Sequence, residues 1–515
     1  MKRIIVRKDS YYDSVFLMLI NQGVKDADGV TEAVVAMGTD MNRDLLKDMS
    51  LSNADVESAT ANDLIIALDG ASEEALDNAE KTVDTLLKKK SSGNQQLFRP
   101  TSLSAAIEVV PGANLALLSI PGRYVAREAR KALENGLHVM IFSDNVPLED
   151  EIRLKKLARD KGLLLMGPDC GTAIINGKPL AFANVVKHGT IGIVAASGSG
   201  LQELTCCIDK AGGGVSQAIG TGGRDVRREV GGVTMLMGIE ALGADPGTAV
   251  ISIISKPPAE SVVDAAIEAL RQTGKPAVVH FIGARRREDE GCIRFAPSLE
   301  DAAHIAVELT GDAAHSAADF SLPESDIDTI VQAESEAIGR RQRYLRGLFA
   351  GGTLAEEALF VLQPTLGTIY SNVHPDQNCR LEDPTVSREH TIIDLGDDTF
   401  TEGRPHPMID VSIRTGQLEK ELQNGEMALL LLDFVLGYGA HGDPAGAMAD
   451  AIRAARSAAH DAGGYLPVIA SVTGTDRDPQ NLTLQRQKLE DAGCVVMPSN
   501  AQAARLAARI MEKVG

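Results

Sequence analysis

The chain has 515 residues, of which 44% are hydrophobic and 24% are charged, and a chain of this length corresponds to about three or four domains. Lys and Arg number 51 against 71 Asp and Glu, which gives a formal net charge of −20 at pH 7. This acidic balance excludes nucleic acid and anionic membranes as main partners. We therefore expect a small anionic substrate, held by a local positive site such as the backbone N–H groups of a helix N-terminus.

The composition also predicts a cytoplasmic protein. Aromatic residues make up 3% and Trp is absent, so the core must be filled by aliphatic side chains, as in parallel α/β sheets. No apolar stretch reaches the ~18 residues that a membrane span needs. The six cysteines form no C-x-x-C pair, and the first residues, Met1-Lys-Arg-Ile-Ile-Val6, do not form a signal peptide. Free thiols in a reducing compartment are expected.

Short β-branched runs alternate with helical periodicity in the first ninety residues, which predicts a small β-α-β-α-β-α domain over 1–95. The expected elements, in chain order, lie at 4–6, 10–19, 34–37, 42–49, 64–68 and 73–90. A charged stretch containing Gly and Ser, at 88–96, predicts a solvated linker.

Apolar strands separated by helices follow, and they predict parallel sheets covered on both faces. We expect a Rossmann-type, CoA-binding-like domain over 96–187, a second α/β domain over 188–312, a linker and helix over 313–340, and a last domain over 341–515. The expected strands lie at 115–120, 138–142, 163–168, 191–196, 250–254 and 277–282. An Ala/Ser/Asp-rich stretch between Gly311 and about Ser325 predicts the linker.

The last domain repeats the order of the 188–312 domain. A strand at 345–349 leads into Gly351-Gly-Thr-Leu-Ala355 and a helix, as 191–196 leads into Ser197-Gly-Ser-Gly-Leu201 and a helix. Further pairs are 392–396 with 218–222, 428–433 with 249–254, and 466–471 with 276–281. The repeat predicts two flavodoxin-like domains, and a chance match of generic α/β units is the alternative.

Two glycine-rich loops are candidate sites for an anion. Each follows a buried-type strand and precedes a helix, so its N–H groups lie at the positive end of the helix dipole. If the repeated halves pack around a pseudo-twofold axis, both helix N-termini face one pocket. The structural alternative for the first loop is a tight turn with a serine as N-cap. Neither loop has the sequence of a P-loop. The candidate phosphate-binding residues are Ser197, Gly198, Ser199, Gly200, Gly351, Gly352 and Thr353.

Charged residues follow two other strands of the first half. In Gly220-Thr-Gly222-Gly223-Arg224-Asp225 an arginine lies at the carboxyl edge of the sheet, where open α/β sheets bind ligands. Lys256 ends another strand and can reach the same crevice as a point charge. The alternatives are a surface turn with a solvated ion pair and a solvated lysine.

Two loops of the second half are rich in polar groups. Gly403-Arg-Pro-His-Pro-Met-Ile-Asp410 and Gly437-Tyr-Gly-Ala-His-Gly-Asp-Pro444 present His406 and His441 as candidates for proton transfer. Their spacing matches no known zinc or iron site, so no metal is assigned. In the loop 167–172, Cys170 is interpreted as a buried, inert thiol rather than a nucleophile. Cys206 and Cys207 are assigned to packing.

These loops also carry a resemblance to known proteins. Ile191-Gly-Ile-Val-Ala-Ala-Ser-Gly-Ser-Gly200, Gly167-Pro-Asp-Cys170 and Gly220-Thr-Gly-Gly-Arg-Asp225 resemble the succinyl-CoA synthetase α subunit, whose pattern runs G-P-N-C, G-I-V-S-R-S-G-T and G-I-G-G-D. Gly351-Gly-Thr-Leu354 and Ile393-Asp-Leu-Gly396 are similar to the CoA-ligase domain at the end of the β subunit.

The FdrA family is a closer match and covers essentially the whole chain. The segments that carry this resemblance are Tyr12-Asp-Ser-Val15, Gly403-Arg-Pro-His-Pro-Met408 and Asp433-Phe-Val-Leu-Gly-Tyr-Gly-Ala-His441. The resemblance implies Rossmann-like and flavodoxin-like domains of the succinyl-CoA synthetase type.

The chain departs from succinyl-CoA synthetases where those enzymes carry phosphate. Their phosphorylated histidine lies in a G-H-A-G segment after the strand that matches 277–282, and residues 283–296 of this chain contain no histidine. Ser255-Lys256 stands where the supporting glutamate is expected. No nucleotide-grasping domain and no Gly-rich CoA loop are recognisable. A self-contained nucleotide-driven CoA ligase is therefore not expected, and CoA is not assigned as a cofactor.

The FdrA resemblance implies a subunit that acts with unlike subunits in an oligomeric carbamoyltransferase, which interconverts oxalurate plus phosphate with oxamate plus carbamoyl phosphate. The two glycine-rich loops would hold the phosphate, Arg224 and Lys256 would clamp phosphate or carboxylate, and His406 or His441 would transfer protons. One alternative is an acyl-CoA ligase completed by a partner subunit. The other is a non-catalytic scaffold.

Overall fold

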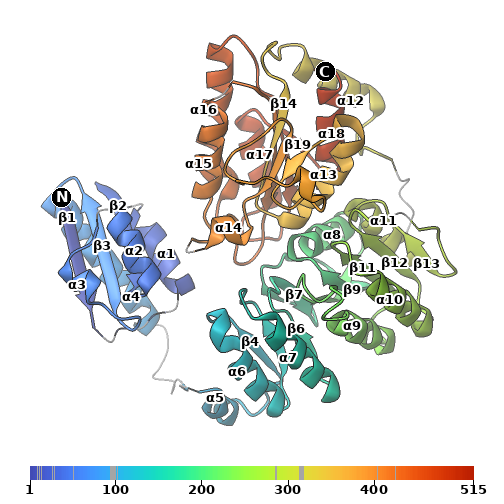
Figure 1. The fold of residues 1–515 in the computed structure, drawn as a ribbon, viewed down its shortest axis with the longest axis horizontal. Helices are drawn as coiled ribbons and strands as arrows, with labels where there is room; N and C mark the ends of the chain where they lie inside the picture. Colours follow the sequence, from blue (N-terminus) through green and yellow to red (C-terminus); the bar gives the residue numbers. More distant parts are fainter. Residues whose placement is uncertain are drawn as a thin grey trace. The chain divides into compact units, whose positions relative to one another are not determined.

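The computed structural model describes residues 1–515 except 9, 11, 13, 26, 28, 50, 93–99, 101, 285–286, 312–317, 403, 424 and 515. It divides into two compact units, Met1–Ser102 and Leu103–Gly515 (Figure 1). No helix of the described residues is long and apolar enough to cross a membrane.

The N-terminal unit is a small sheet covered by helices. Its elements are β1 (Lys2–Arg7), α1 (Ser14–Lys25), β2 (Val30–Met37), α2 (Asp40–Asp48), α3 (Ala54–Glu57), β3 (Leu64–Gly70) and α4 (Glu73–Ser92). The strand order is β1-β3-β2, and β3 is antiparallel to both neighbours. In the expected β-α-β unit of β1, α1 and β2, the third strand β3 therefore lies between the two strands. Alternate residues of β3 belong to separate apolar clusters on the two faces of the sheet, as the period of a strand requires.

The linker expected over 88–96 begins later than predicted, because α4 continues as a helix to Ser92. The remaining expected linker residues, 93–96, lie outside the described residues.

The C-terminal unit begins with a parallel sheet, followed by a β-hairpin. Its first elements are α5 (Leu103–Val109), β4 (Leu115–Leu118), α6 (Gly122–Glu134), β5 (His138–Ile141), α7 (Leu148–Asp160), β6 (Leu165–Met166), β7 (Thr172–Ile175) and β8 (Lys178–Ala181). Strands β4, β5 and β6 pair in parallel in that order. The β7–β8 hairpin instead extends the next sheet along the chain, by antiparallel pairing of β7 with β10.

Two larger α/β lobes follow. The first lobe contains β9 (His188–Ala196), α8 (Gly198–Lys210), β10 (Val215–Gly220), α9 (Val233–Ala244), β11 (Val250–Ser255), α10 (Glu260–Thr273), β12 (Ala277–Phe281), β13 (Ile293–Phe295) and α11 (Leu299–Leu309). After α12 (Glu324–Ser335), the second lobe contains β14 (Tyr344–Phe349), α13 (Gly352–Leu366), β15 (Tyr370–Ser371), η1 (Gln377–Cys379), β16 (Thr391–Asp394), α14 (Asp398–Thr401), α15 (Ser412–Glu421), β17 (Met427–Val435), α16 (Pro444–Asp461), β18 (Val468–Thr473), α17 (Leu482–Asp491), β19 (Val495–Met497) and α18 (Asn500–Met511).

Both lobes have the same strand order. The first lobe runs β10-β9-β11-β12-β13 and the second runs β16-β14-β17-β18-β19, with every neighbouring pair parallel. Numbered along each lobe, with the short edge strand β15 of the second sheet left out, this is the order 2-1-3-4-5 of flavodoxin-like sheets. The predicted fold class, an α/β protein with two flavodoxin-like domains, is confirmed. The domain boundaries themselves stay predictions.

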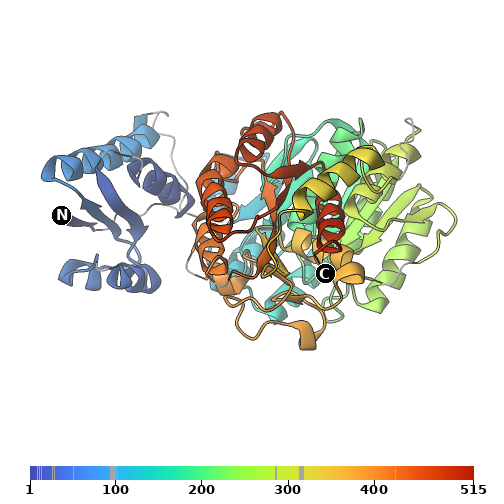
Figure 2. The same cartoon turned by 90° about the horizontal axis from the view of Figure 1, so that it is seen from above.

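The lobes pack through a shared layer of helices. One apolar cluster joins α8 and α11 of the first lobe to α13 and α18 of the second, and the lobes lie side by side in both views (Figures 1 and 2). The outer face of the first sheet is covered by α9 and α10, and that of the second by α15, α16 and α17. Because both faces of each sheet are buried, the strands read as continuous apolar runs.

Candidate functional site

Helices α8 and α13 begin at equivalent points of the two lobes. Strand β9 leads directly into α8, and β14 leads directly into α13. Each of these strands lies where the order of its sheet reverses, between β10 and β11 in the first lobe and between β16 and β17 in the second. Ligands of open α/β sheets bind in the crevice at this position.

The two helix N-termini touch directly, in place of the expected arrangement in which both face one pocket. The hydroxyls of Ser197 and Thr353 lie 2.6 Å apart. A Cβ atom on Gly351 would lie 2.8 Å from Cβ of Ser199, and one on Gly200 would lie 2.8 Å from Cγ2 of Thr353. Both glycines are therefore needed for this close approach. Because the two loops touch, an anion must bind beside them rather than between them.

The available donors lie on the α8 side. Ser197 is the N-cap of α8, and its hydroxyl accepts a hydrogen bond from the Gly200 amide at 3.0 Å. The structural alternative for this loop, a tight turn with a serine as N-cap, therefore also applies. Within the described part of the chain, the Gly198 and Ser199 amides donate to no protein acceptor. Gly198 lines a cavity of about 10 Å³, roughly the room for one water molecule. The cavity is lined by Asp169, Cys170, Gly171, Thr172, Ala195, Ser197, Gly198, Gly220 and Gly222.

Carboxylates lie at the start of α13 instead. Asp433 accepts from the amides of Ala350 and Gly351 at 2.7 and 2.8 Å. A Cβ on Gly352 would lie 2.3 Å from Oδ2 of Asp394. Burial raises the pKa of Asp394 to about 7, against the opposing effect of the Lys256 charge. The two loops therefore have unequal surroundings, and an anion at α13 requires Asp394 to be protonated.

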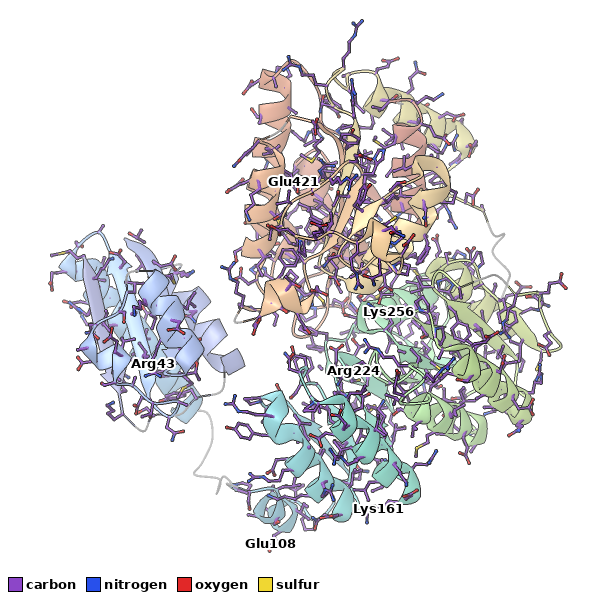
Figure 3. The ribbon with its side chains drawn as sticks, in the orientation of Figure 1. Arg43, Glu108, Lys161, Arg224, Lys256 and Glu421 are labelled. Atoms are coloured by element: carbon purple, nitrogen blue, oxygen red, sulfur yellow. The ribbon has the colours of Figure 1, made fainter. Side chains whose placement is uncertain are left out.

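Lys256 bridges the lobes. Its ammonium lies 2.8 Å from Oε1 of Glu356 in α13 (Figure 3). Burial lowers the pKa of Lys256, but Glu356 and Asp394 together raise it above its usual range. The second oxygen of Glu356 is buried, and no hydrogen-bond partner is found for it among the described residues. Lys256 is thus a charged group at the site, already paired with one carboxylate.

Arg224 pairs with a residue of α7. Its Nε is 2.9 Å from Oε2 of Glu151, a buried residue of α7. The neighbouring Asp225 pairs with buried Lys155, also of α7, at 2.6 Å. This loop joins the β4–β6 sheet to the first lobe (Figure 3). Gly223 has open space around its Cβ position.

His406 lies beside the start of α13. A Cβ on Gly396, which follows Asp394, would lie 2.5 Å from Nε2 of His406. The Nδ1 atom accepts from the amide of Met408 at 3.2 Å, so the proton of the neutral ring is on Nε2. Burial lowers the pKa of His406 to about 4. The ring is therefore a neutral donor at ordinary pH. Gly403, at the start of this predicted loop, lies outside the described residues.

His441 lies on the loop before α16. Its Nδ1 accepts from the amide of Asp443 at 3.0 Å, and its own amide donates to the carbonyl oxygen of Met408 at 2.7 Å. Asp443 caps α16. The described contacts bring His441 to the loop of His406 but not to the two helix N-termini.

The sequence missed several residues of this site. In the loop 167–172, Cys170 is buried, and burial raises its pKa to about 12, which agrees with the interpretation as an inert thiol. Its neighbours Asp169 and Thr172 line the cavity but are not among the predicted site residues. Asp394 and Glu356 are not among them either. A carboxylate directly after a parallel strand is the signal that could have identified Asp394.

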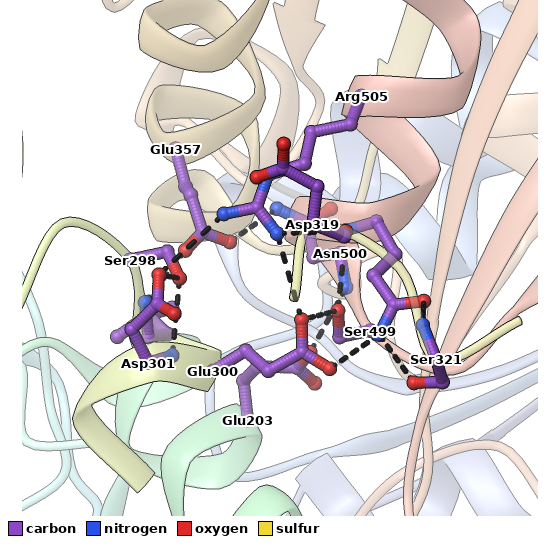
Figure 4. A network of polar contacts seen from close by, with 12 residues as sticks. Glu203, Ser298, Glu300, Asp301, Asp319, Ser321, Glu357, Ser499, Asn500 and Arg505 are labelled. Carbon is purple, nitrogen blue, oxygen red and sulfur yellow. Dashed lines mark hydrogen bonds and ion pairs between the residues drawn. The ribbon is translucent and has the colours of Figure 1, made fainter. Parts of the chain in front are cut away.

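Reciprocal contacts hold the two helix N-termini together (Figure 4). Glu203 in α8 accepts from the amide of Asn500, the first residue of α18, at 3.0 Å. Glu357, at the equivalent position of α13, accepts from the amide of Leu299, the first residue of α11, at 2.8 Å. Each lobe therefore caps a helix of the other. Burial raises the pKa of Glu357 to about 7.

Three family profiles match the chain. The CoA-ligase profile matches residues 348–510, the CoA binding domain profile matches 186–283, and the profile described as AllF, heavy metal-associated domain matches 1–100. Residues 1–100 contain neither Cys nor His, so they offer no thiolate or imidazole ligand for a heavy-metal ion. Gly122 begins α6, beside the β4–β6 sheet. A Cβ on Gly122 would lie 2.3 Å from the Asn145 carbonyl oxygen, so the Asn145 backbone fills the space there.

Several relatives and solved structures are similar. Parts of the chain are 29% identical to succinate–CoA ligase subunit alpha of Aquifex aeolicus and 30% identical to the ADP-forming sulfoacetate-CoA ligase subunit SauD of Bilophila wadsworthia. These matches cover 33% and 34% of this chain and 57% and 60% of those subunits. A dinucleotide-forming acetyl-coenzyme A synthetase of Ca. Korarchaeum cryptofilum is 15% identical, with 86% of this chain and 94% of that chain covered and a TM-score of 0.31.

The whole-length match is to a bacterial protein. Over 510 residues the chain is 43% identical to the uncharacterized protein YahF of Escherichia coli, with 98% of both chains covered. With the CoA-ligase and CoA-binding profiles in its two lobes, the chain belongs to the FdrA family of succinyl-CoA synthetase-like proteins, together with YahF.

Proposed function

We propose that this chain is a subunit of a carbamoyltransferase, which acts with unlike subunits to interconvert oxalurate plus phosphate with oxamate plus carbamoyl phosphate. One observation carries the proposal. At the start of α8, the Gly198 and Ser199 amides have no protein acceptor among the described residues, and the buried Thr172 hydroxyl has no partner there. Gly198 and Thr172 line one cavity. Amides at a helix N-terminus are suited to a phosphoryl group.

The surrounding groups suit a carbonyl substrate. In the transition state of carbamoyl transfer, negative charge grows on the carbonyl oxygen and on the leaving phosphate, and fixed donors stabilise both. The amides of α8 would hold the phosphate. The Nε2–H of His406 would donate to the carbonyl oxygen as a neutral imidazole. Lys256 would supply positive charge between the lobes, although it must share that charge with Glu356.

The histidine geometry supports transfer without a phosphoenzyme. A histidine accepts phosphate through a ring nitrogen that has a free lone pair. In His406 and His441 the Nδ1 lone pair accepts a backbone N–H, which puts the proton of the neutral ring on Nε2. Neither ring is therefore arranged as a nucleophile.

An acyl-CoA ligase completed by a partner subunit is the second candidate. The CoA-ligase profile and the ligase relatives favour it. One histidine also has the required tautomer. The Nδ1 atom of His280 in β12 lies 2.9 Å from the Ala296 carbonyl oxygen, to which it must donate. Its buried Nε2 has no partner among the described residues.

Product analysis of the assembled complex separates the two functions. Carbamoyl phosphate and oxamate should yield phosphate and oxalurate in equal amounts, with no requirement for CoA or nucleotide. The absence of both products would exclude the transferase. A ligase would instead form acyl-CoA with nucleotide and acquire an acid-labile phosphoryl group, and His280→Asn should abolish that labelling.

A further inference from the structure

The loop between β6 and β7 carries an unusual aspartate. Asp169 has φ +55°, a left-handed conformation that few residues other than glycine adopt. Its amide donates to the Ser143 carbonyl oxygen at 3.0 Å, which holds the backbone in place. The side chain is exposed, and no hydrogen bond or ion pair of its carboxylate with another described residue is found. A backbone held in this region by its surroundings often positions a functional side chain.

Asp169 and Thr172 line the same cavity as the start of α8. Thr172 is only 2% exposed, and its hydroxyl is without a partner in the described part of the chain. That hydroxyl lies 3.8 Å from the position of a Cβ on Gly198. Leaving a buried hydroxyl unpaired costs about 1–3 kcal/mol. A polar ligand in the cavity would offset this cost, so Thr172 is evidence for a ligand that is independent of the helix N-terminus.

Charges of both signs surround Asp169. Although the side chain reaches solvent, desolvation by the protein packed around it raises its pKa to about 6. The charge of Lys256 lowers this pKa, those of Asp144 and Asp398 raise it, and that of Arg224 lowers it. A carboxyl group with a pKa close to the working pH can both take up and release a proton during turnover.

We propose that Asp169 is the acid–base residue of this site and that the Thr172 hydroxyl binds a phosphoryl oxygen beside α8. The proposal rests on the carbamoyl-transfer function. The amide nitrogen of oxamate forms a bond to the carbonyl carbon of carbamoyl phosphate. The bond from that carbon to the phosphate oxygen breaks, the phosphate leaves with the electron pair, and the proton of the attacking nitrogen passes to the Asp169 carboxylate. In the reverse direction, protonated Asp169 returns this proton to the leaving amide nitrogen.

Asp169→Asn tests the acid–base role, because Asn also tolerates a positive φ. In the assembled complex we expect kcat to fall by about 100-fold or more, with KM for carbamoyl phosphate little changed. The wild-type rate should decline below about pH 6, where Asp169 is protonated, and this decline should be absent from the residual rate of the variant. Asp144→Asn, a neighbouring carboxylate outside the cavity lining, is the matched control and should keep the wild-type kcat.

Thr172→Val tests the ligand site separately, by calorimetry of inorganic phosphate binding to the full chain. We expect a loss of affinity of about tenfold, the effect of one hydrogen bond to a charged group. Unchanged affinity overturns the role of Thr172. A wild-type kcat and pH profile in Asp169→Asn overturn only the role of Asp169. No transfer by the wild-type complex overturns the carbamoyltransferase and the acid–base role together, whereas the phosphate measurement still decides on Thr172.

Discussion

The two lobes share one strand order but differ in charge at their helix N-termini. In the first lobe, Ser197 caps α8, and Gln202 in the next turn is neutral and binds the Asn184 side chain. In the second lobe, α13 begins against Asp394, and Glu356, at the position equivalent to Gln202, pairs with a lysine of the first lobe. A repeated backbone therefore brings two helix ends together, while the residues that differ make one end a donor and the other an acceptor.

This difference indicates which lobe binds the anion. An anion is stabilised by free amides and a hydroxyl, which the first lobe supplies. It is repelled by an ionised carboxylate, which the second lobe supplies unless Asp394 is protonated. We expect the first lobe to hold the anion and the second lobe to contribute groups whose charge depends on pH. The predictions below test this division.

Gly198→Ala should have the largest effect. A Cβ here meets nothing closer than the Thr172 hydroxyl at 3.8 Å, so the chain should fold normally while the methyl group fills the small cavity. We expect kcat/KM to fall by about 100-fold, as for the loss of one oxyanion donor, with Tm unchanged. Gly416→Ala, in open space on α15, is the control. Wild-type kinetics of Gly198→Ala would contradict an anion site in the first lobe.

Glu357→Ala and Glu203→Ala should weaken the lobe junction to a similar degree. Each removes the acceptor of a buried helix amide in the other lobe, at a cost of about 1–3 kcal/mol in the free energy of unfolding. Denaturant melts of both single variants and of the double variant measure this. Stability unchanged in both would show that the reciprocal caps do not join the lobes.

The pH dependence of stability should distinguish Glu357 within this pair. Its pKa in the folded state, about 7, is raised above the ordinary value of 4.5. The neutral form is therefore favoured by folding. Its contribution is complete below about pH 4.5 and is lost as the pH rises through 7. Melts of Glu357→Ala should show a weaker decline over this range than wild type, and an identical decline would contradict burial of the neutral carboxyl group.

Asp394→Asn should change anion binding by about tenfold. In wild type, phosphate affinity should rise as the pH falls below 7, because protonation removes the negative charge beside α13. The variant should bind phosphate more tightly at pH 8 and lose this step in the pH profile, as measured by calorimetry. An unchanged profile would place the anion away from the second lobe.

Ser197→Ala should have the smallest effect. It removes the N-cap of α8 and the hydroxyl contact with Thr353, which together correspond to about 1–2 kcal/mol. Thermal unfolding measures the loss, and Thr353→Val should reproduce only the part that comes from the hydroxyl contact. Equal losses in the two variants would show that the cap itself contributes little.

The predicted elements agree with the structure because their causes are local. Apolar runs at 191–196 and 345–349 are strands since both sheet faces bury them, and the glycines and Ser197 that follow start the helices. The repeat of this pattern was enough to predict two flavodoxin-like lobes. Pairing between segments far apart in the chain was harder to predict from sequence. The insertion of β3 between β1 and β2 was not predicted, and α4 ends later than predicted.

The amino-acid sequence by itself determined the fold class, the duplication and the glycine-rich starts of α8 and α13, because periodicity and turn chemistry depend on near neighbours. Only the tertiary structure decided the surroundings of these helix starts. Lys256 meets Glu356 across 100 positions, Arg224 pairs with Glu151, and Asp169 comes to the cavity of α8. Charge and desolvation at a site depend on which distant segments pack together, and the spacing of residues along the sequence does not determine that packing.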